Sequence, residues 1–262
     1  MTDIRVVLRY AQLVAHLTAL DLKVRFAGSK LGLAWLTIAP AFTVSVYLLL
    51  FSRILKVQTI PGLDPLDYGL LVVAGLLPWI GLSESLTRGT ASVLAQRNLM
   101  KSRLFPMELI PVTAVCAGGL SQLVGTILLA VVLAVTGKLS ASCMFLPILL
   151  LFQMVFTLGL VWFLSCVNII YRDTSQLISL GLLLMMFVSP IAYTPDMMPL
   201  DLSFLLALNP LAYLIEGYRD ILLFGRLPQP GNSAVFAVVA AAVGIAGYRY
   251  FMRLRRVLPD LV

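Results

Sequence analysis

The chain has 262 residues, of which 60% are hydrophobic and 12% are charged. Soluble domains average about 25% charged residues, so this composition excludes an ordinary soluble enzyme. The net charge of +7 does not indicate a nucleic-acid-binding protein, because the cations lie between apolar runs instead of forming one patch.

The first 26 residues predict a helix that lies on the membrane surface and does not cross it. One polar stripe runs along this otherwise apolar helix, formed by Arg5, Arg9, Gln12, His16 and Lys23. Asp21 and Arg25 are four residues apart and can form an ion pair within the helix. Lys23, Arg25 and Lys30 make a basic collar, and residues 1–30 are predicted to be one cytosolic interfacial unit. No cleavable signal peptide is predicted.

Residues 31–262 are predicted to form an all-α integral membrane domain with six transmembrane helices. A bilayer core of about 30 Å needs about 20 apolar residues in a helix. Six segments meet this length if Glu84 and Arg88 are tolerated within the second. The predicted spans are about 31–53, 68–91, 109–136, 143–169, 174–195 and 228–250.

A further apolar segment, 202–215, is too short to cross, and Asn209-Pro210 interrupts it. We therefore expect re-entrant outer half-helices between spans five and six. The loops on the side of the termini hold 14 of the 19 cations. Because Lys and Arg concentrate in cytosolic loops, both termini are predicted to be cytosolic.

The sequence lacks the motifs of a nucleotide-binding protein or an enzyme. Gly28-Ser29-Lys30 resembles the end of a P-loop, but positions 23 and 31 are Lys and Leu, where that motif needs Gly and Ser or Thr. The three cysteines, Cys116, Cys143 and Cys166, lie in apolar runs without metal-ligand spacing, so neither a metal site nor a disulfide framework is indicated. If this protein pumps, its ATPase is another chain.

Glu84 is the charged residue with the strongest claim to function inside a span. A carboxylate in the membrane is a functional candidate by default. Arg88 follows four residues later, so the two can also form a purely structural pair. The sequence leaves open whether Glu84 and Arg88 are a structural pair or contact substrate and gate the path.

Four stretches, in chain order, resemble the membrane subunits of ATP-binding-cassette polysaccharide exporters. They lie at 22–42, 97–111, 171–178 and 189–228, which together cover the membrane entrance, two cytosolic loops and the outer re-entrant region of that family. The matching residues are Lys23, Arg25, Phe26, Ser29, Leu31, Gly32, Trp35, Pro40, Asn98, Leu99, Lys101, Phe105, Pro106, Pro111, Arg172, Asp173, Gln176, Ser189, Pro190, Tyr193, Asn209, Pro210 and Arg219.

The resemblance implies a homodimer in the bacterial inner membrane with two copies of a cytosolic ATPase. Those partners would bind ATP and Mg, and this chain would hold no cofactor. The implied cargo is a polysaccharide linked to a polyprenyl carrier and moved through a dimeric tunnel. O-antigen is the first choice, with teichoic acid and capsule as alternatives. A drug or lipid exporter, a secondary transporter and a membrane glycosyltransferase are the rival classes.

The resemblance also assigns residues to the ATPase contact. The loop at about 96–105 is expected to form a coupling helix in a groove of the ATPase, although a plain positive-inside loop is the alternative. The expected coupling residues are Arg97, Leu99, Lys101, Arg103 and Phe105, with Arg172 and Asp173 from the second cytosolic loop.

Substrate contacts are expected at the collar and along the tunnel. Arg25 and Lys30 can bind a carrier pyrophosphate, with Trp35 at the same entrance, or they can serve only to orient the chain. Aromatic rings can stack on sugar rings, although they also gather at membrane interfaces for other reasons. The tunnel candidates are Tyr47, Phe51, Tyr68, Trp79, Tyr193, Tyr213 and Tyr218.

Overall fold

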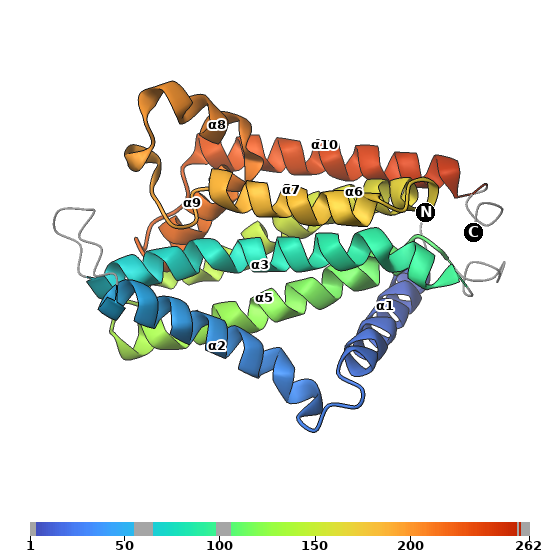
Figure 1. The fold of residues 1–262 in the computed structure, drawn as a ribbon, viewed down its shortest axis with the longest axis horizontal. Helices are drawn as coiled ribbons and strands as arrows, with labels where there is room; N and C mark the ends of the chain where they lie inside the picture. Colours follow the sequence, from blue (N-terminus) through green and yellow to red (C-terminus); the bar gives the residue numbers. More distant parts are fainter. Residues whose placement is uncertain (1–3, 55–64, 98–105, 256, 258–262) are drawn as a thin grey trace.

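The computed structural model describes residues 4–54, 65–97, 106–255 and 257, and all regular structure within them is helical. The long helices run side by side, and the N-terminal end of α1 and the C-terminal end of α10 lie at the same end of the molecule (Figure 1). The α-helices are α1 (Ile4–Arg25), α2 (Trp35–Leu49), α3 (Pro65–Ala95), α5 (Leu109–Val135), α6 (Leu146–Ile170), α7 (Thr174–Val188), α8 (Ser203–Leu208), α9 (Pro210–Leu222) and α10 (Pro230–Leu254).

Short turns of other helix types join these elements. A single π-helical turn, η2 (Leu50–Ile54), extends α2. The 3-10 turns are η1 (Gly32–Ala34), η3 (Ala141–Phe145), η4 (Pro195–Met197) and η5 (Leu200–Leu202).

Five helical segments in the described part of the chain are long and apolar enough to cross a membrane. They are Gly32–Leu49, Leu66–Ala95, Leu109–Val135, Ala141–Ile170 and Pro230–Leu254. The sixth expected span, 174–195, is a helix only as far as Val188, because Pro190 disfavours helical backbone at Ser189, whose ψ is 142°. The 15 residues of α7 extend about 22 Å at 1.5 Å per residue, less than the bilayer core.

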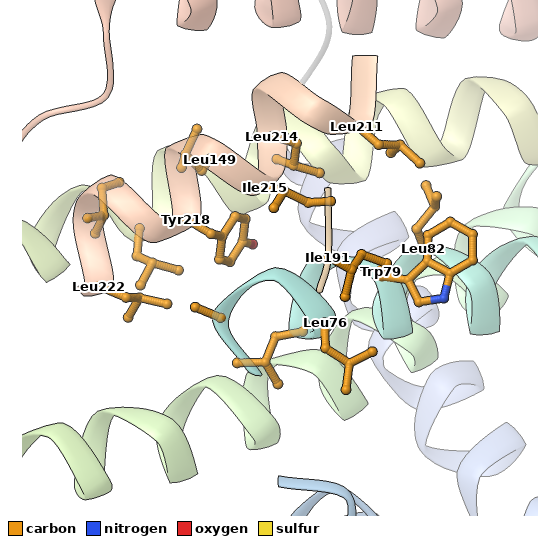
Figure 2. Close-up of a cluster of buried hydrophobic side chains, with 14 of the residues drawn as sticks. Leu76, Trp79, Leu82, Leu149, Ile191, Leu211, Leu214, Ile215, Tyr218 and Leu222 are labelled. Carbon is orange, nitrogen blue, oxygen red and sulfur yellow. The ribbon is translucent and has the colours of Figure 1, made fainter. Parts of the chain in front are cut away.

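The long helix α3 is the centre of the fold. In the most apolar 18-residue stretch of α3, 83% is buried inside the molecule, against 6% in Gly32–Leu49, which contains α2. Figure 2 shows how side chains from α3 and α9 meet in the main core. The labelled residues are Leu76, Trp79 and Leu82 of α3, Leu149 of α6, Ile191, and Leu211, Leu214, Ile215, Tyr218 and Leu222 of α9. Because α2 is covered so little, most of its apolar surface faces outward.

Glycines let α6 and α10 approach closely. A Cβ atom added at Gly247 would lie 1.9 Å from the carbonyl oxygen of Gly159, and one added at Gly159 would lie 2.4 Å from that of Val243. Both distances are far below van der Waals contact. Small residues at such a crossing bring backbones together, which is a common way for helices to pack in membranes.

A polar cluster inside the core joins α3, α5, α6 and α9. Gln122 and Gln153 exchange amide hydrogen bonds of 2.8 Å, and Gln122 also donates to the Tyr218 hydroxyl at 2.7 Å. Gln153 donates further to the carbonyl of Pro78 at 2.9 Å. Each of the three side chains is buried, so the hydrogen bonds replace water that the apolar surroundings exclude.

The break in the expected outer hairpin is set by Asn209 and Pro210. The Asn209 side chain accepts from the Leu211 amide at 3.0 Å and donates to Ser189 Oγ at 3.0 Å. Asn209 thus caps α9 while Pro210 occupies its first turn, where the missing N–H costs nothing. The segment forms two helices as expected, but α9 continues to Leu222. Whether the pair enters a membrane stays a prediction.

Arg219 fastens this region to the rest of the molecule. Its guanidinium donates to the carbonyl oxygens of Ile191 at 2.8 Å and Tyr193 at 3.2 Å, and to Glu216 at 2.8 Å. Its Nε also lies 3.4 Å from the carbonyl of Leu71 in α3. The side chain is 1% exposed, so one buried cation ties α9, the bend at 189–193 and α3 together.

Candidate functional site

The strongest candidate site is a small cavity where α1 turns into α2, which we call the collar pocket. It has a volume of about 160 Å³, and its lining includes Arg25, Phe26, Trp35, Pro40, Ile80 and Glu84. The turn needs Gly28 and Gly32, whose φ values of 80° and 50° lie in the left-handed region that favours glycine.

Local contacts orient the aromatic and basic groups of the turn. The Trp35 indole donates to Ser29 Oγ at 3.0 Å, which holds the ring across the turn. The Arg25 guanidinium lies 5.1 Å from the centre of the Phe26 ring, a cation–π distance. Lys30 is exposed in the same turn. The structure thus brings Arg25 and Trp35 together with Glu84, whereas Lys30 lies in the same turn without lining the pocket.

Two ion pairs connect α1 to α3, and they correct the expected pairing. Arg25 binds Glu84, and Arg88 donates to Asp21 at 2.8 Å. The spacing of four residues predicted a pair of Asp21 with Arg25 within α1, and it left open whether Glu84 pairs with Arg88 within α3 or contacts substrate. Neither pair within a helix forms in the described structure, because the C-terminal end of α1, which lies mainly along α5, brings Asp21 and Arg25 within reach of charges on α3.

The four charges are only partly withdrawn from solvent. The exposed fractions of the side chains are 29% and 15% in the Arg25–Glu84 pair, and 31% and 27% in the Arg88–Asp21 pair. Asp21 and Arg88 also border a second cavity of about 230 Å³ between α1, α3 and α5. Groups from solution or from a lipid headgroup can therefore reach all four charges.

Three of the predicted tunnel aromatics form a group near the opposite end of α2. The rings of Tyr47 and Phe51 are stacked with centres 6.2 Å apart, and Phe51 meets Tyr68 edge-on at 5.6 Å. The Tyr68 hydroxyl donates to the carbonyl of Ala192. Tyr47 and Phe51 remain half-buried, whereas Tyr68 is buried at the start of α3.

The other predicted rings are held within the chain. Trp79 is 7% exposed and packs in the main core, so its ring faces protein neighbours. Tyr218 has no exposed surface and bonds to Gln122, which contradicts its prediction as a tunnel ring. Tyr193 and Tyr213 are half-buried, and their hydroxyls donate to the carbonyls of Val188 and Ala207. Their contact with polysaccharide stays a prediction.

The expected ATPase contacts can be placed only in part. Arg97 is exposed beyond the end of α3, and Arg172 and Asp173 are exposed in the turn between α6 and α7. These positions lie toward the end of the molecule where the described termini lie (Figure 1). Leu99, Lys101, Arg103 and Phe105 lie outside the described residues, so their coupling role stays a prediction.

Two features of the structure were not predicted from the sequence. Arg219 is one of the five cations that the charge count places on the side away from the termini, yet it is the most buried cation for which an exposure is described. Its position between Glu216 and Asp220, with apolar residues on both sides of this charged group, was the available signal. Gln122 and Gln153 were not singled out, although amides inside long apolar runs indicate a buried hydrogen-bonding partner.

The helices and their composition define a multi-pass membrane protein with an ion-paired collar and no described enzyme-like site. Comparison with known families extends this class. The family model for ABC-2 type transporters matches residues 12–223. The chain belongs to the ABC-2 type transporter family.

Curated relatives match most of the chain. An O-antigen export system permease protein RfbA of Klebsiella pneumoniae is 32% identical over 238 residues, covering 89% of this chain and 90% of the relative. A second Klebsiella pneumoniae protein of that name is 31% identical over 93% and 92% of the two chains. One from Myxococcus xanthus is 30% identical over 92% and 91%. The resemblance to polysaccharide exporter membrane subunits is thereby confirmed.

Proposed function

We propose that this chain is the membrane subunit of an exporter that moves lipid-linked O-antigen from the cytosol across the bacterial inner membrane. The observation that carries the proposal is the identity of 30–32% to three O-antigen export permeases, over about nine tenths of each chain. Because the sequence has no nucleotide-binding motif, the energy would come from ATP and Mg bound by two copies of a partner ATPase.

The collar pocket is suited to the anionic head of a lipid carrier. Arg25 can form two parallel hydrogen bonds with a phosphate, and exposed Lys30 can add a point charge. In the described structure Arg25 is already paired with Glu84, so an arriving pyrophosphate would compete with that carboxylate. A cavity of about 160 Å³ is too small for a polymer, so it would hold only the headgroup and its nearest atoms.

The polymer itself would pass between two copies of the chain. Support comes from the large apolar surface that α2 and α7 leave uncovered in a single chain. Phe42 of α2 is 70% exposed, and Phe187 of α7 is 72% exposed. Half-buried Tyr47 and Phe51 lie on the same uncovered helix and its π-turn, where their rings could stack on passing sugars. Membrane lipids would cover the remaining apolar faces.

Gene deletion tests the transport function directly. We expect cells that lack the chain to lose O-antigen from their surface and to accumulate polyprenyl-linked O-antigen on the cytosolic side. Both effects are measured by surface glycan staining and by mass spectrometry of extracted lipid-linked glycan. The proposed cargo would be overturned if the deletion changed neither the surface O-antigen nor the lipid-linked O-antigen inside the cell. It would also be overturned if the deletion removed a different surface polymer, such as capsule.

Substitution at Lys30 tests the headgroup site. Lys30→Gln is expected to lower the export rate several-fold, and Lys30→Arg to retain most of it, because a phosphate contact needs the cation and not the particular side chain. Lys23→Gln is the matched control, since Lys23 is also exposed and lies on the polar stripe of α1. Equal effects at both positions would mean that the cations serve only orientation or anchoring.

A further inference from the structure

Four charges at the collar have two complete ways to pair. In the described structure, Asp21 binds Arg88 and Arg25 binds Glu84 across two helices. The members of each helix are also four residues apart, so Asp21 can reach Arg25 and Glu84 can reach Arg88 within one helix. In both helices the acid precedes the base, which is the more favourable order for such a pair.

We propose that Asp21, Arg25, Glu84 and Arg88 form an exchangeable latch between α1 and α3. In the closed state the two pairs between helices hold α1 against α3 beside the collar pocket. In the released state each helix satisfies its own charges, and α1 moves away so that the pocket opens. The export measurements rest on the proposed function, whereas the measurements of the distance between α1 and α3 do not.

Release is cheap because no charge is left alone. A buried ion pair is costly to break when one partner stays uncompensated in an apolar place. Here each charge finds its second partner one helical turn away, and all four side chains are 15–31% exposed, so water can follow them. Partly exposed pairs of this kind contribute little net stability, which keeps the two states close in free energy.

The packing of α1 also permits movement. α1 lies mainly along α5, and an open apolar groove of about 720 Å³ separates α1 from parts of α5 and α6. Thr18 lies on this buried side, and its Oγ1 is the one buried side-chain polar atom without a hydrogen-bond partner in the described part of the chain. The turn after α1 contains two left-handed glycines, Gly28 and Gly32, with open space around both.

The latch would control access to the site and connect it to the ATPase. Arg25 and Glu84 line the collar pocket, so release widens one wall of it and frees Arg25 for an anionic headgroup. Glu84 and Arg88 lie on α3, which leads directly into the segment 96–105 expected to meet the ATPase. A movement of that segment would therefore reach α1 through these four side chains.

Charge reversals separate the two pairings because each reversal keeps one of them. The pair of substitutions Asp21→Arg and Arg88→Asp preserves attraction between the helices but places like charges within each helix. Glu84→Arg with Arg88→Glu does the opposite, because each helix keeps a pair while both contacts between helices become repulsive. All four reversals together (Asp21→Arg, Arg25→Asp, Glu84→Arg and Arg88→Glu) preserve both pairings. The first two combinations leave Arg25 unchanged.

The position of α1 is measured in the intact transporter with its partner ATPase. Spin labels are placed at exposed Leu20 of α1 and Ala95 of α3, after the three native cysteines are replaced by alanine. We expect a short and a long distance population whose ratio changes with ATP. Asp21→Arg with Arg88→Asp should reduce the long population about tenfold, because two favourable pairs within helices become unfavourable.

The remaining variants complete the test. Glu84→Arg with Arg88→Glu should leave mainly the long distance. The fourfold reversal should restore both populations, with the long one somewhat smaller because the base now precedes the acid within each helix. If the repulsive variant does not fold, the neutral combination Glu84→Gln and Arg88→Gln should still raise the long population, because it removes both contacts between the helices and keeps the pair of Asp21 with Arg25 within α1. Reversal of Asp67 and Lys138 is the control, because this pair joins α3 to the α5–α6 turn and has no alternative partner four residues away.

The results distinguish the latch from a static clamp and from the proposed function. In a static clamp the ion pairs only hold α1 against α3 and never exchange, so the variant with Asp21→Arg and Arg88→Asp should export normally. A latch must exchange its pairs, so the same variant should lose export although Arg25 is unchanged. Restored distances without restored export in the fourfold reversal support the latch and assign position 25 a separate need for a cation. The latch is overturned if the fourfold reversal fails to restore the distances, or if all variants share one distribution.

Discussion

Arg219 and Arg25 both pair with a glutamate, but their surroundings differ at the two regions of the molecule that they hold together. Arg219 is 1% exposed and donates to backbone carbonyls from two separate segments as well as to Glu216. Arg25 is partly exposed, and Glu84 is its one described charged partner. The region around α9 is thus fixed by several hydrogen bonds that must all be kept, whereas the collar is held by ion pairs that can be exchanged.

This difference follows from the polar groups that lose their partner when each interaction breaks. Without the Arg219 guanidinium, the carbonyl oxygens of Ile191 and Tyr193 would remain in an apolar interior without a donor, which costs free energy for each group. Loss of the Arg25–Glu84 pair leaves both side chains near water. The comparison assigns rigidity to the region around α9 and movement to α1.

Replacing Arg219 should have the largest effect on stability. Arg219→Met keeps an unbranched apolar stem but removes every donor, and we expect a loss of about 3–5 kcal/mol because buried carbonyls and Glu216 lose their partner. The measurement is the apparent melting temperature of the purified protein in detergent. Arg249→Met, at an exposed position of α10, is the control. Equal melting temperatures for the two variants would contradict the contrast between the regions.

The crossing of α6 and α10 gives the next effect. Gly247→Ala would place a methyl group 1.9 Å from the Gly159 carbonyl oxygen, so the two helices must separate. Overpacking of this kind costs about 1–3 kcal/mol. Gly231→Ala on the same helix has open space and is the control. Thermal unfolding of both variants checks the prediction, which fails if Gly247→Ala is as stable as its control.

The helices were predictable from the sequence, but their partners were not. Apolar length and period report the local environment of a segment, which is why α3, α5, α6 and α10 fall close to the expected ranges. The end of α7 at Val188 required attention to Pro190 as well as to hydrophobicity. Length alone extended that helix too far.

The site was predictable in its members and not in its contacts. Arg25, Trp35 and Glu84 were all selected as candidates, and the structure places them around one cavity. The pairing between them was missed because spacing along one helix cannot report a helix that folds back from another part of the chain. Arg219 was misplaced for a similar reason, since a cation in a short apolar hairpin looks like a loop residue until its acceptors are known.

The amide cluster should show strong coupling between its members. Gln153→Leu removes both hydrogen bonds to Gln122, the donor to the Pro78 carbonyl and the acceptor of the Tyr218 hydroxyl, so we expect a loss of about 1–3 kcal/mol. Gln122→Leu added to it should cost much less than a second equal loss, because the two hydrogen bonds between the amides can be lost only once. A double-mutant cycle on thermal stability measures this coupling. Strictly additive losses would mean that the two amides do not act as one network.

The smallest predicted effect lies in α1 and has the opposite sign. Thr18→Val replaces a buried hydroxyl that has no partner with a methyl group of similar shape. We expect stability to rise by about 1 kcal/mol, because the cost of an unsatisfied polar group is removed. Thr113→Val in α5 is the matched control, since the Thr113 hydroxyl is also buried but donates to the Ile110 carbonyl at 2.8 Å. That variant should be neutral or less stable.

The sign of the Thr18 effect sharpens the contrast between the two regions. The unpaired Thr18 hydroxyl weakens the packing of α1 against its neighbours. Replacing it with an apolar group should therefore favour the closed state of the latch and lower the population with the long spin-label distance. Stability and export would then move in opposite directions, as expected where function needs movement. If Thr18→Val instead destabilises the protein as much as the loss of a paired hydroxyl would, then α1 is packed as firmly as α9 and the collar is not the flexible part of the molecule.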